Sequence, residues 1–130
     1  MENIKIKGGL RVAATLRLVD ETGGKAFGPG VAQLLEGVRR TGSLRGTASA
    51  MGMSYSKAWK VLHESEARLG ILLLERQTGG AGGGSRLTPE GDEMIKQYAA
   101  FREEGQRLLA ELAARYFGEE ESDGRTDSVL

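Results

Sequence analysis

The chain has 130 residues, no cysteine and one histidine, His63, and its 18 basic and 18 acidic side chains give a net charge of zero. This composition excludes disulfides, thiolate metal sites and histidine-pair metal sites, and the length suits one domain with a tail. The sequence has no long apolar run and no signal peptide, so we expect a soluble, cytoplasmic protein that needs no metal or cofactor.

The charge is unevenly distributed along the chain. Residues 37–86 hold eight Lys and Arg against three Glu, a surplus of +5, whereas residues 119–130 carry −4. Phosphate attraction is screened within about 8–10 Å, so a local surplus matters more than the total charge. The middle of the chain is therefore a candidate for nucleic-acid contact, although chance clustering also produces so small an excess.

A short β-hairpin is predicted after residues 1–9, which carry no clear pattern. Residues 10–19 place four apolar side chains on one parity, as in a half-buried strand: Leu10, Val12, Leu16 and Leu18. Residues 20–24 predict a turn, and residues 25–27 predict the return strand.

The first helix is predicted over residues 31–40, because apolar side chains recur at helical spacing from Val31 to Val38. Gly37 weakens this helix by roughly 1 kcal/mol relative to alanine, which close packing of another helix against the glycine would explain. Arg39 and Arg40 in the last turn suit the negative end of the helix dipole, and they suit phosphate contact equally well.

Two further helices are predicted to meet at a tight corner within residues 41–69. Ser43 and Ser54 are suitable N-caps, and Gly52 can adopt the left-handed conformation that ends the first of the two helices. This arrangement is the helix-turn-helix pattern. Lys57 and Lys60 lie opposite the apolar arc of the second helix, as in a recognition helix that enters the major groove. An ordinary helical corner with a solvated face is the alternative.

A second hairpin is predicted directly after the recognition helix, which gives a winged helix. It consists of a strand over residues 71–78, a glycine-rich tip over 79–85 and a return strand over 86–88. Arg76 and Arg86 would stand on the two arms, and the glycine backbone would lie close to phosphate. The tip lacks the Gly-Lys-Ser/Thr of a P-loop and the βαβ unit of a dinucleotide site, so a plain flexible loop is the stronger alternative.

The last helix is predicted from Thr88, a good N-cap followed by Pro89, to about Phe117. Its roughly 45 Å exceed what a domain of this size covers, so the simplest partner for the excess apolar face is the same helix of a second subunit. The residues assigned to this dimer seam are Met94, Tyr98, Phe101, Leu108 and Leu112. A helix wrapped over its own core is the alternative, and residues 118–130 read as a disordered acidic tail.

Two motifs, taken in order and at their spacing, resemble a known family. The recognition helix carries Ser54-Tyr55-Ser56-Lys57-Ala58-Trp59, and the wing carries Thr78-Gly79-Gly80-Ala81-Gly82-Gly83 before Leu87-Thr88-Pro89-Glu90-Gly91. Together they resemble the N-terminal domain of the ModE-type molybdate-responsive transcriptional regulators and, more distantly, the LysR-type DNA-binding domain. The resemblance covers about residues 10–115.

The resemblance implies a dimer that binds a palindromic operator in double-stranded DNA. It places the recognition helix in the groove and the wing on the backbone. The helical arc puts Trp59 at the edge of the core face, which favours packing over the alternative of DNA contact. The candidate DNA-binding residues are Ser43, Arg45, Ser54, Tyr55, Ser56, Lys57, Lys60, Arg76, Thr78, Gly79, Gly80 and Arg86. Full-length regulators of this type sense molybdate through C-terminal domains, so we expect either a stand-alone DNA-binding form or a sensor on another chain.

The predicted architecture is mainly α with a small amount of β. It has an N-terminal segment at 1–9, a winged helix-turn-helix domain at 10–87, a dimerisation helix at 88–117 and an acidic tail at 118–130. The predicted function is a homodimeric, sequence-specific transcriptional regulator without catalytic activity, linked to molybdate or oxyanion metabolism. A winged-helix protein-interaction module and an oxyanion-binding sensor are the alternatives.

Overall fold

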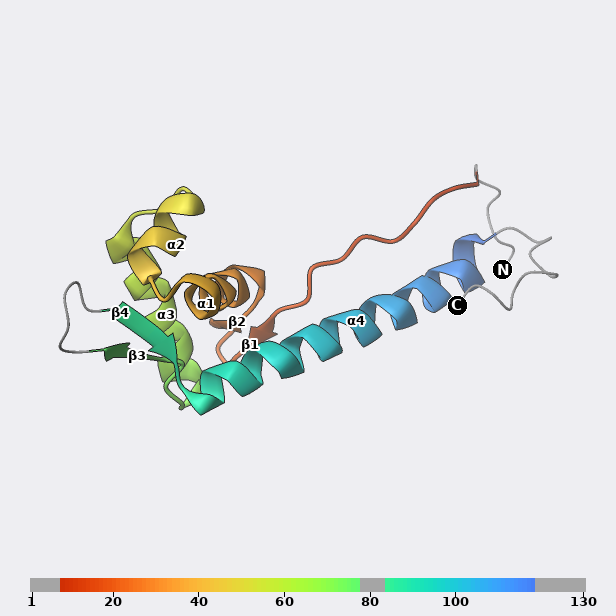
Figure 1. Ribbon diagram of the computed structural model, residues 1–130. Helices are drawn as coiled ribbons and strands as arrows, with labels where there is room; N and C mark the ends of the chain where they lie inside the picture. The colour runs from red at the N-terminus through yellow and green to blue at the C-terminus, as the bar shows by residue number, and fades with distance from the viewer. Residues whose placement is uncertain (1–7, 78–83, 119–130) are drawn as a thin grey trace. The chain divides into compact units, whose positions relative to one another are not determined.

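The computed structural model describes residues 8–77 and 84–118 (Figure 1). Thr78, Gly79 and Gly80 of the predicted wing and residues 119–130 of the predicted tail lie outside these ranges. The chain divides into two compact units. Leu16–Ala99 form the first, called the winged unit below, and Met1–Thr15 with Ala100–Leu130 form the second, called the terminal unit.

Four helices and two short hairpins make up the described residues, which confirms the predicted mainly α architecture with a small β content. In chain order they are β1 (Leu18–Val19), β2 (Lys25–Phe27), α1 (Pro29–Thr41), α2 (Leu44–Ala50), α3 (Tyr55–Leu69), β3 (Leu74–Gln77), β4 (Gly84–Leu87) and α4 (Pro89–Phe117). Each hairpin is a separate two-stranded antiparallel sheet, β1 with β2 and β3 with β4. None of the described helices combines the length and the apolar character needed to span a bilayer.

The first hairpin is shorter than predicted. Only Leu18 and Val19 form β1, whereas residues 10–17 have no regular strand, and Leu10 and Val12 are 65% and 42% exposed. Alternating apolar residues need a neighbouring strand to pair with, and β2 supplies only three residues. The prediction of a half-buried strand over residues 10–19 is therefore wrong for most of its length.

Asp20 organises the turn of this hairpin. Its Oδ1 accepts hydrogen bonds from the Thr22 hydroxyl at 2.7 Å and from the backbone N–H groups of Thr22 and Gly24 at 2.9 and 2.8 Å. Arg68 at the end of α3 donates from Nε to Asp20 Oδ2 at 3.0 Å. The Thr22 hydroxyl and the Gly24 amide are the main causes that lower the pKa of Asp20 from 3.8 to about 2.

The core of the winged unit forms where α1, α3 and β2 meet the start of α4. Its large, fully buried side chains are Phe27, Leu34, Leu35, Val38, Leu44, Leu62, Leu73 and Ser65. Each buried aliphatic or aromatic side chain contributes about 1.5–3 kcal/mol relative to exposure. Ser65, the one polar member, donates from its hydroxyl to the Ala26 carbonyl, so its burial leaves no unpaired group.

Gly37 allows α1 and α2 to pack closely, as the sequence predicts. A Cβ added to Gly37 would overlap Thr47 Cγ2 and lie 2.6 Å from Thr47 Oγ1. Thr47 is buried, and its hydroxyl donates to the Ser43 carbonyl at 2.8 Å. The glycine thus weakens α1 locally but makes room for the neighbouring helix.

Helix α4 begins and ends as predicted. The Thr88 hydroxyl accepts from the Gly91 N–H at 2.9 Å, and the helix continues to Phe117. Tyr98, however, is only 4% exposed: it packs edge-on against Phe27 with ring centroids 5.2 Å apart, and its hydroxyl donates to the Leu16 carbonyl at 2.8 Å. Its assignment to a dimer seam is wrong, because the early turns of α4 face the core of their own unit.

Candidate nucleic-acid interface

The corner between α2 and α3 has the predicted capping. The Ser43 hydroxyl accepts from the Gly46 N–H at 2.8 Å, and the Ser54 hydroxyl accepts from the Lys57 N–H at 3.1 Å. Gly52 lies in the left-handed region with φ 75°, where a side chain would be strained. Both serine hydroxyls therefore start helices, and the corner fixes the direction in which α3 leaves α2.

Helix α3 presents two lysines to solvent. Ala58 and Leu62 are fully buried on its inner face, whereas Lys57 and Lys60 are exposed on the other. Neither lysine takes part in an ion pair with the residues at 8–77 and 84–118, so no carboxylate oxygen described there lies within 4.0 Å of their ammonium groups. Both charges are available to an anionic partner.

Three aromatic rings follow one another along α3 at intervals of four residues. Tyr55 and Trp59 meet edge to face with centroids 6.3 Å apart, and Trp59 stacks on His63 at 4.6 Å. Trp59 is half-buried against the core, in accord with its assignment to packing. Its Nε1 is buried and has no hydrogen-bond partner among the described residues.

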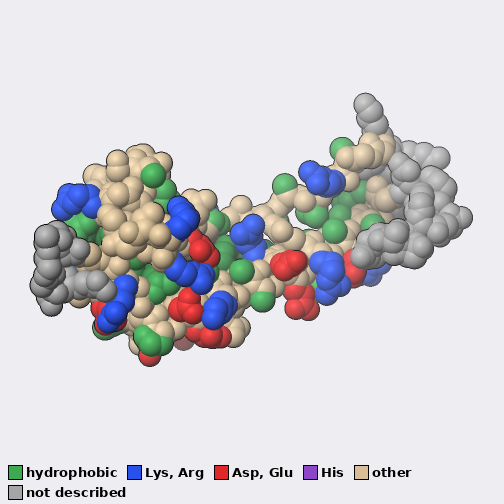
Figure 2. Space-filling model, viewed as in Figure 1, with side chains coloured by type: hydrophobic (Ala, Val, Ile, Leu, Met, Phe, Trp, Pro, Cys, Tyr) green, Lys and Arg blue, Asp and Glu red, His purple; other side chains and the backbone are tan. Residues whose placement is uncertain are grey.

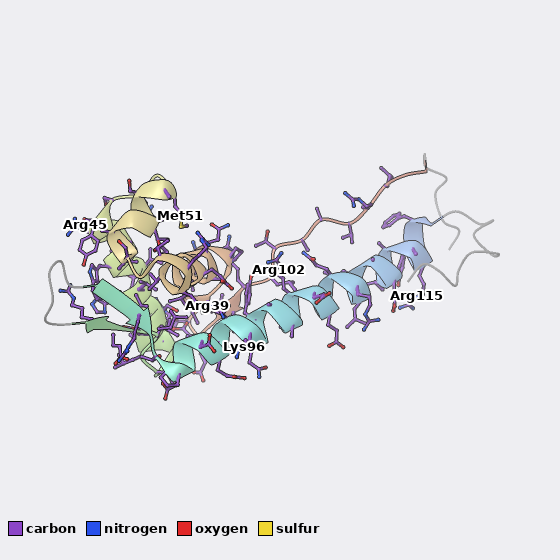
Figure 3. The ribbon with its side chains drawn as sticks, in the orientation of Figure 1. Arg39, Arg45, Met51, Lys96, Arg102 and Arg115 are labelled. Atoms are coloured by element: carbon purple, nitrogen blue, oxygen red, sulfur yellow. The ribbon has the colours of Figure 1, made fainter. Side chains whose placement is uncertain are left out.

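Two arginines from other elements lie on these rings. The Arg45 guanidinium of α2 lies 4.0 Å from the Tyr55 ring centroid, and the Arg76 guanidinium of β3 lies 5.0 Å from that of Trp59. Arg76 also donates from Nη2 to the Tyr55 hydroxyl at 3.3 Å. Figure 3 shows Arg45 at the outer edge of α2. Sequence spacing gave no sign of these contacts, because they depend on how three consecutive elements pack against one another.

The arginines on the two arms of the wing have different partners. In the β3–β4 register Glu75 lies opposite Arg86, and the Arg86 Nε lies 3.1 Å from Glu75 Oε2. Arg86 is thus paired with a carboxylate, whereas Arg76 is held by aromatic groups. Arg39 of α1 is also paired, at 3.2 Å from both Glu36 and Asp92.

Buried contacts that the sequence did not reveal attach the wing to the helices. Glu66 of α3 is 8% exposed, and its Oε2 accepts from the Leu73 and Leu74 N–H groups at 2.8 and 3.3 Å. On the other arm, the Ser85 N–H donates to the Gly42 carbonyl at 3.1 Å. Both strands are therefore fixed where they leave the helical core. The one sequence signal for the Glu66 contact was the position of a glutamate on the apolar face of α3, where a buried carboxylate needs hydrogen-bond donors.

The candidate residues that the structure describes come from α2, α3 and the two wing strands. Those with exposed side chains are Arg45, Ser54, Ser56, Lys57, Lys60, Arg76 and Arg86, and those that are half-buried are Ser43 and Tyr55. On the face drawn in Figure 2, basic and acidic side chains alternate near α1 and the start of α4, while a basic group stands apart from acidic ones over α2.

Three helices with a tight α2–α3 corner, followed at once by an antiparallel hairpin, define a winged helix-turn-helix domain. Residues 32–92 match the family described as bacterial regulatory helix-turn-helix protein, lysR family. The chain is 40% identical over 77 residues to the molybdenum transport protein ModE of Herbaspirillum seropedicae, covering 58% of this chain and 28% of that protein.

Other relatives give the same assignment. The molybdenum-pterin-binding protein MopB of Rhodobacter capsulatus is 34% identical over 94 residues, 72% of this chain and 34% of its own length. The transcriptional regulator ModE of Yersinia pestis is 38% identical over 66 residues, 50% of this chain and 25% of its own length. Residues 32–92 are therefore similar to the helix-turn-helix domain of the LysR family and to the matching part of ModE-type regulators, and the chain spans about a third or less of these relatives.

Proposed function

We propose that this chain is a sequence-specific DNA-binding regulator of transcription. The observation that carries the proposal is the placement of Lys57 and Lys60 on the exposed face of α3, whose opposite face is fixed to the core by Ala58 and Leu62. A helix presented in this way fits the major groove, where lysine donates to guanine O6 and N7 or to phosphate. Such a regulator acts where the DNA is, in the cytoplasm, and needs no catalytic centre.

We further propose that the regulator is a homodimer joined through the part of α4 that belongs to the terminal unit. This part of the terminal unit exposes large apolar side chains on one side of the helix: Phe101 at 48%, Leu108 at 50%, Leu112 at 41% and Tyr116 at 56%. Packing against the same helix of a second copy would remove this surface from water. A two-fold dimer in turn favours a palindromic operator with two half-sites.

The names of the relatives support a link to molybdenum. The Herbaspirillum protein is named for molybdenum transport and the Rhodobacter protein for molybdenum-pterin binding. We propose that this chain regulates genes of molybdenum handling. The proposal concerns the genes controlled and assigns no molybdate site to the residues described here.

Selection of bound sites from random duplex DNA tests the proposal most directly. The expected result is enrichment of one palindromic sequence, because two identical recognition helices read the two half-sites. Binding to random duplex should also weaken steeply with salt, as phosphate contacts release counterions. Recovery of unenriched sequences together with salt-independent binding would contradict the proposal and favour a protein-interaction module.

A further inference from the structure

Tyr55 contacts two arginines that come from different elements on either side of it in the chain. Its ring lies under the Arg45 guanidinium of α2, 4.0 Å from ring centroid to Cζ. Its hydroxyl accepts from Arg76 Nη2 of β3 at 3.3 Å. One half-buried side chain at the start of α3 thus contacts a cation from the helix before it and a cation from the wing.

Trp59 completes the arrangement. It meets Tyr55 edge to face at 6.3 Å and lies 5.0 Å from the Arg76 guanidinium. Arg76 is therefore held twice, by a ring face and by a hydroxyl. The stack of His63 on the Trp59 ring, with centroids 4.6 Å apart, adds a further contact to the tryptophan.

Five arginines of the winged unit fall into two contrasting groups. Arg39, Arg68 and Arg86 each have a carboxylate within 3.2 Å, which offsets their charge. Arg45 and Arg76, by contrast, have no carboxylate partner among the ion pairs of the described residues. An aromatic face fixes a guanidinium plane and leaves N–H groups at its edge to bind a planar or tetrahedral oxyanion; Arg76 uses one Nη2–H on Tyr55 and keeps the others.

We propose that Tyr55 and Trp59 are positioning residues that hold Arg45 and Arg76 as a preorganised pair of phosphate-binding groups for the backbone of duplex DNA. This inference rests on the proposed DNA-binding function. A free arginine loses much rotamer entropy when it binds, so a guanidinium held in place before binding gives a higher affinity. The pair brackets α3, with one guanidinium from the helix before it and one from the wing after it.

The test uses the full chain and a fluorescent duplex of random sequence, titrated at several salt concentrations. Tyr55→Phe removes the hydroxyl that holds Arg76 but keeps the ring under Arg45. We expect binding to weaken by about threefold to tenfold, the worth of one hydrogen bond, with an unchanged thermal midpoint of unfolding. Arg76→Ala should lower the salt slope by about 1, since it removes a phosphate contact.

A double-mutant cycle separates positioning from direct contact. In the Arg76→Ala background, Tyr55→Phe should have no further effect, whereas its effect should persist in the Arg45→Ala background. An equal loss in both backgrounds would overturn the inference, because Tyr55 would then act on DNA or on the fold directly. Lys96→Ala on α4, whose ammonium lies 3.1 Å from Asp92, is the control and should leave binding close to that of the wild type.

A measurement without DNA tests the positioning alone. Nitrogen relaxation of the arginine Nε–H groups should show Arg45 and Arg76 more ordered than Arg40, and Tyr55→Phe should release Arg76 only. Equal mobility of all three in the wild type would overturn the inference while leaving the proposed function intact. Absence of any salt-dependent binding by the wild type would overturn both the proposed function and the phosphate role.

Discussion

At the scale of single residues, Lys57 and Lys60 carry the clearest consequence for binding. Their ammonium groups are exposed, and they extend from a helix whose opposite face is buried. We expect the double variant Lys57→Ala with Lys60→Ala to bind duplex DNA more weakly and to lower the salt slope by about 2. Fluorescence anisotropy across a salt series measures both quantities.

Lys96 provides the control for this prediction. It lies on α4 with its ammonium 3.1 Å from Asp92, so its charge is already offset. Lys96→Ala should leave the salt slope close to that of the wild type. An unchanged slope in the Lys57/Lys60 double variant would remove both lysines from the interface.

Gly37 gives a residue-scale prediction about stability. Alanine at this position would place its Cβ against Thr47 of α2, so Gly37→Ala should lower the free energy of unfolding by about 1–3 kcal/mol. Gly30→Ala in the same helix meets nothing within 4 Å and should be neutral or slightly stabilising. Urea denaturation of the two variants gives the comparison, and equal stabilities would contradict the packing argument.

At the scale of elements, the buried carboxylate of Glu66 holds the start of the wing. Glu66→Ala leaves the Leu73 and Leu74 N–H groups without their acceptor, which should cost about 1–3 kcal/mol of stability for each unpaired group. Glu66→Gln keeps an acceptor oxygen and should recover part of the loss. Urea denaturation and amide hydrogen exchange at Leu73 and Leu74 provide the measurement. Unaltered protection of both amides in Glu66→Ala would refute the assignment.

The Asp20 turn predicts a pH dependence of stability. Its pKa is lowered from 3.8 to about 2 in the folded protein, chiefly by the Thr22 hydroxyl and the Gly24 amide. The contribution is therefore fully present above pH 3.8 and is lost as the pH falls to about 2. Wild type should exceed Asp20→Asn in stability at pH 6, and the difference should shrink toward pH 2.

Glu21 is the matched control for the pH prediction. It is the exposed neighbour of Asp20 in the same turn. Glu21→Gln should follow the wild type through the acid range in urea titrations at each pH. A difference between wild type and Asp20→Asn that stays constant from pH 6 to pH 2 would contradict the account.

The sequence predicted the elements well wherever local chemistry decides them. Capping by Ser43, Ser54 and Thr88 and the left-handed Gly52 mark helix ends through contacts within a few residues, and the structure has all of them. The strand over residues 10–19 failed because pairing depends on a partner that the pattern does not contain. The Arg45–Tyr55–Arg76 contacts also depend on tertiary packing, which periodicity does not encode.

At the scale of the whole molecule, the long helix was predicted correctly, but its whole apolar stripe was assigned to a dimer interface. Ile95 and Tyr98 in its early turns pack into the winged unit, whereas Phe101, Leu108 and Leu112 remain exposed. The periodicity of the stripe does not show where the helix stops packing on its own unit and where its apolar side chains become exposed. Burial separates the two parts, and only the second remains a candidate for a dimer.

The proposed dimer leads to a prediction about oligomeric state. Leu108→Lys with Leu112→Lys places two charges on the exposed stripe of α4, so the protein should sediment as a monomer and bind a palindromic duplex more weakly. Glu103→Lys, on the opposite side of the helix, should remain dimeric. Analytical ultracentrifugation checks both variants, and a wild-type monomer at all concentrations would rule out the dimer.

Gly42 makes two structural contacts through the backbone of a single residue. Its N–H bonds the Val38 carbonyl and closes α1, while its own carbonyl receives the Ser85 N–H of β4. Together with the Glu66 contacts to the other arm, the Ser85–Gly42 hydrogen bond attaches both strands of the hairpin to the helices. The residues carried between the ends of β3 and β4 could therefore be exchanged to retune what the hairpin touches, while the scaffold that supports it stays the same.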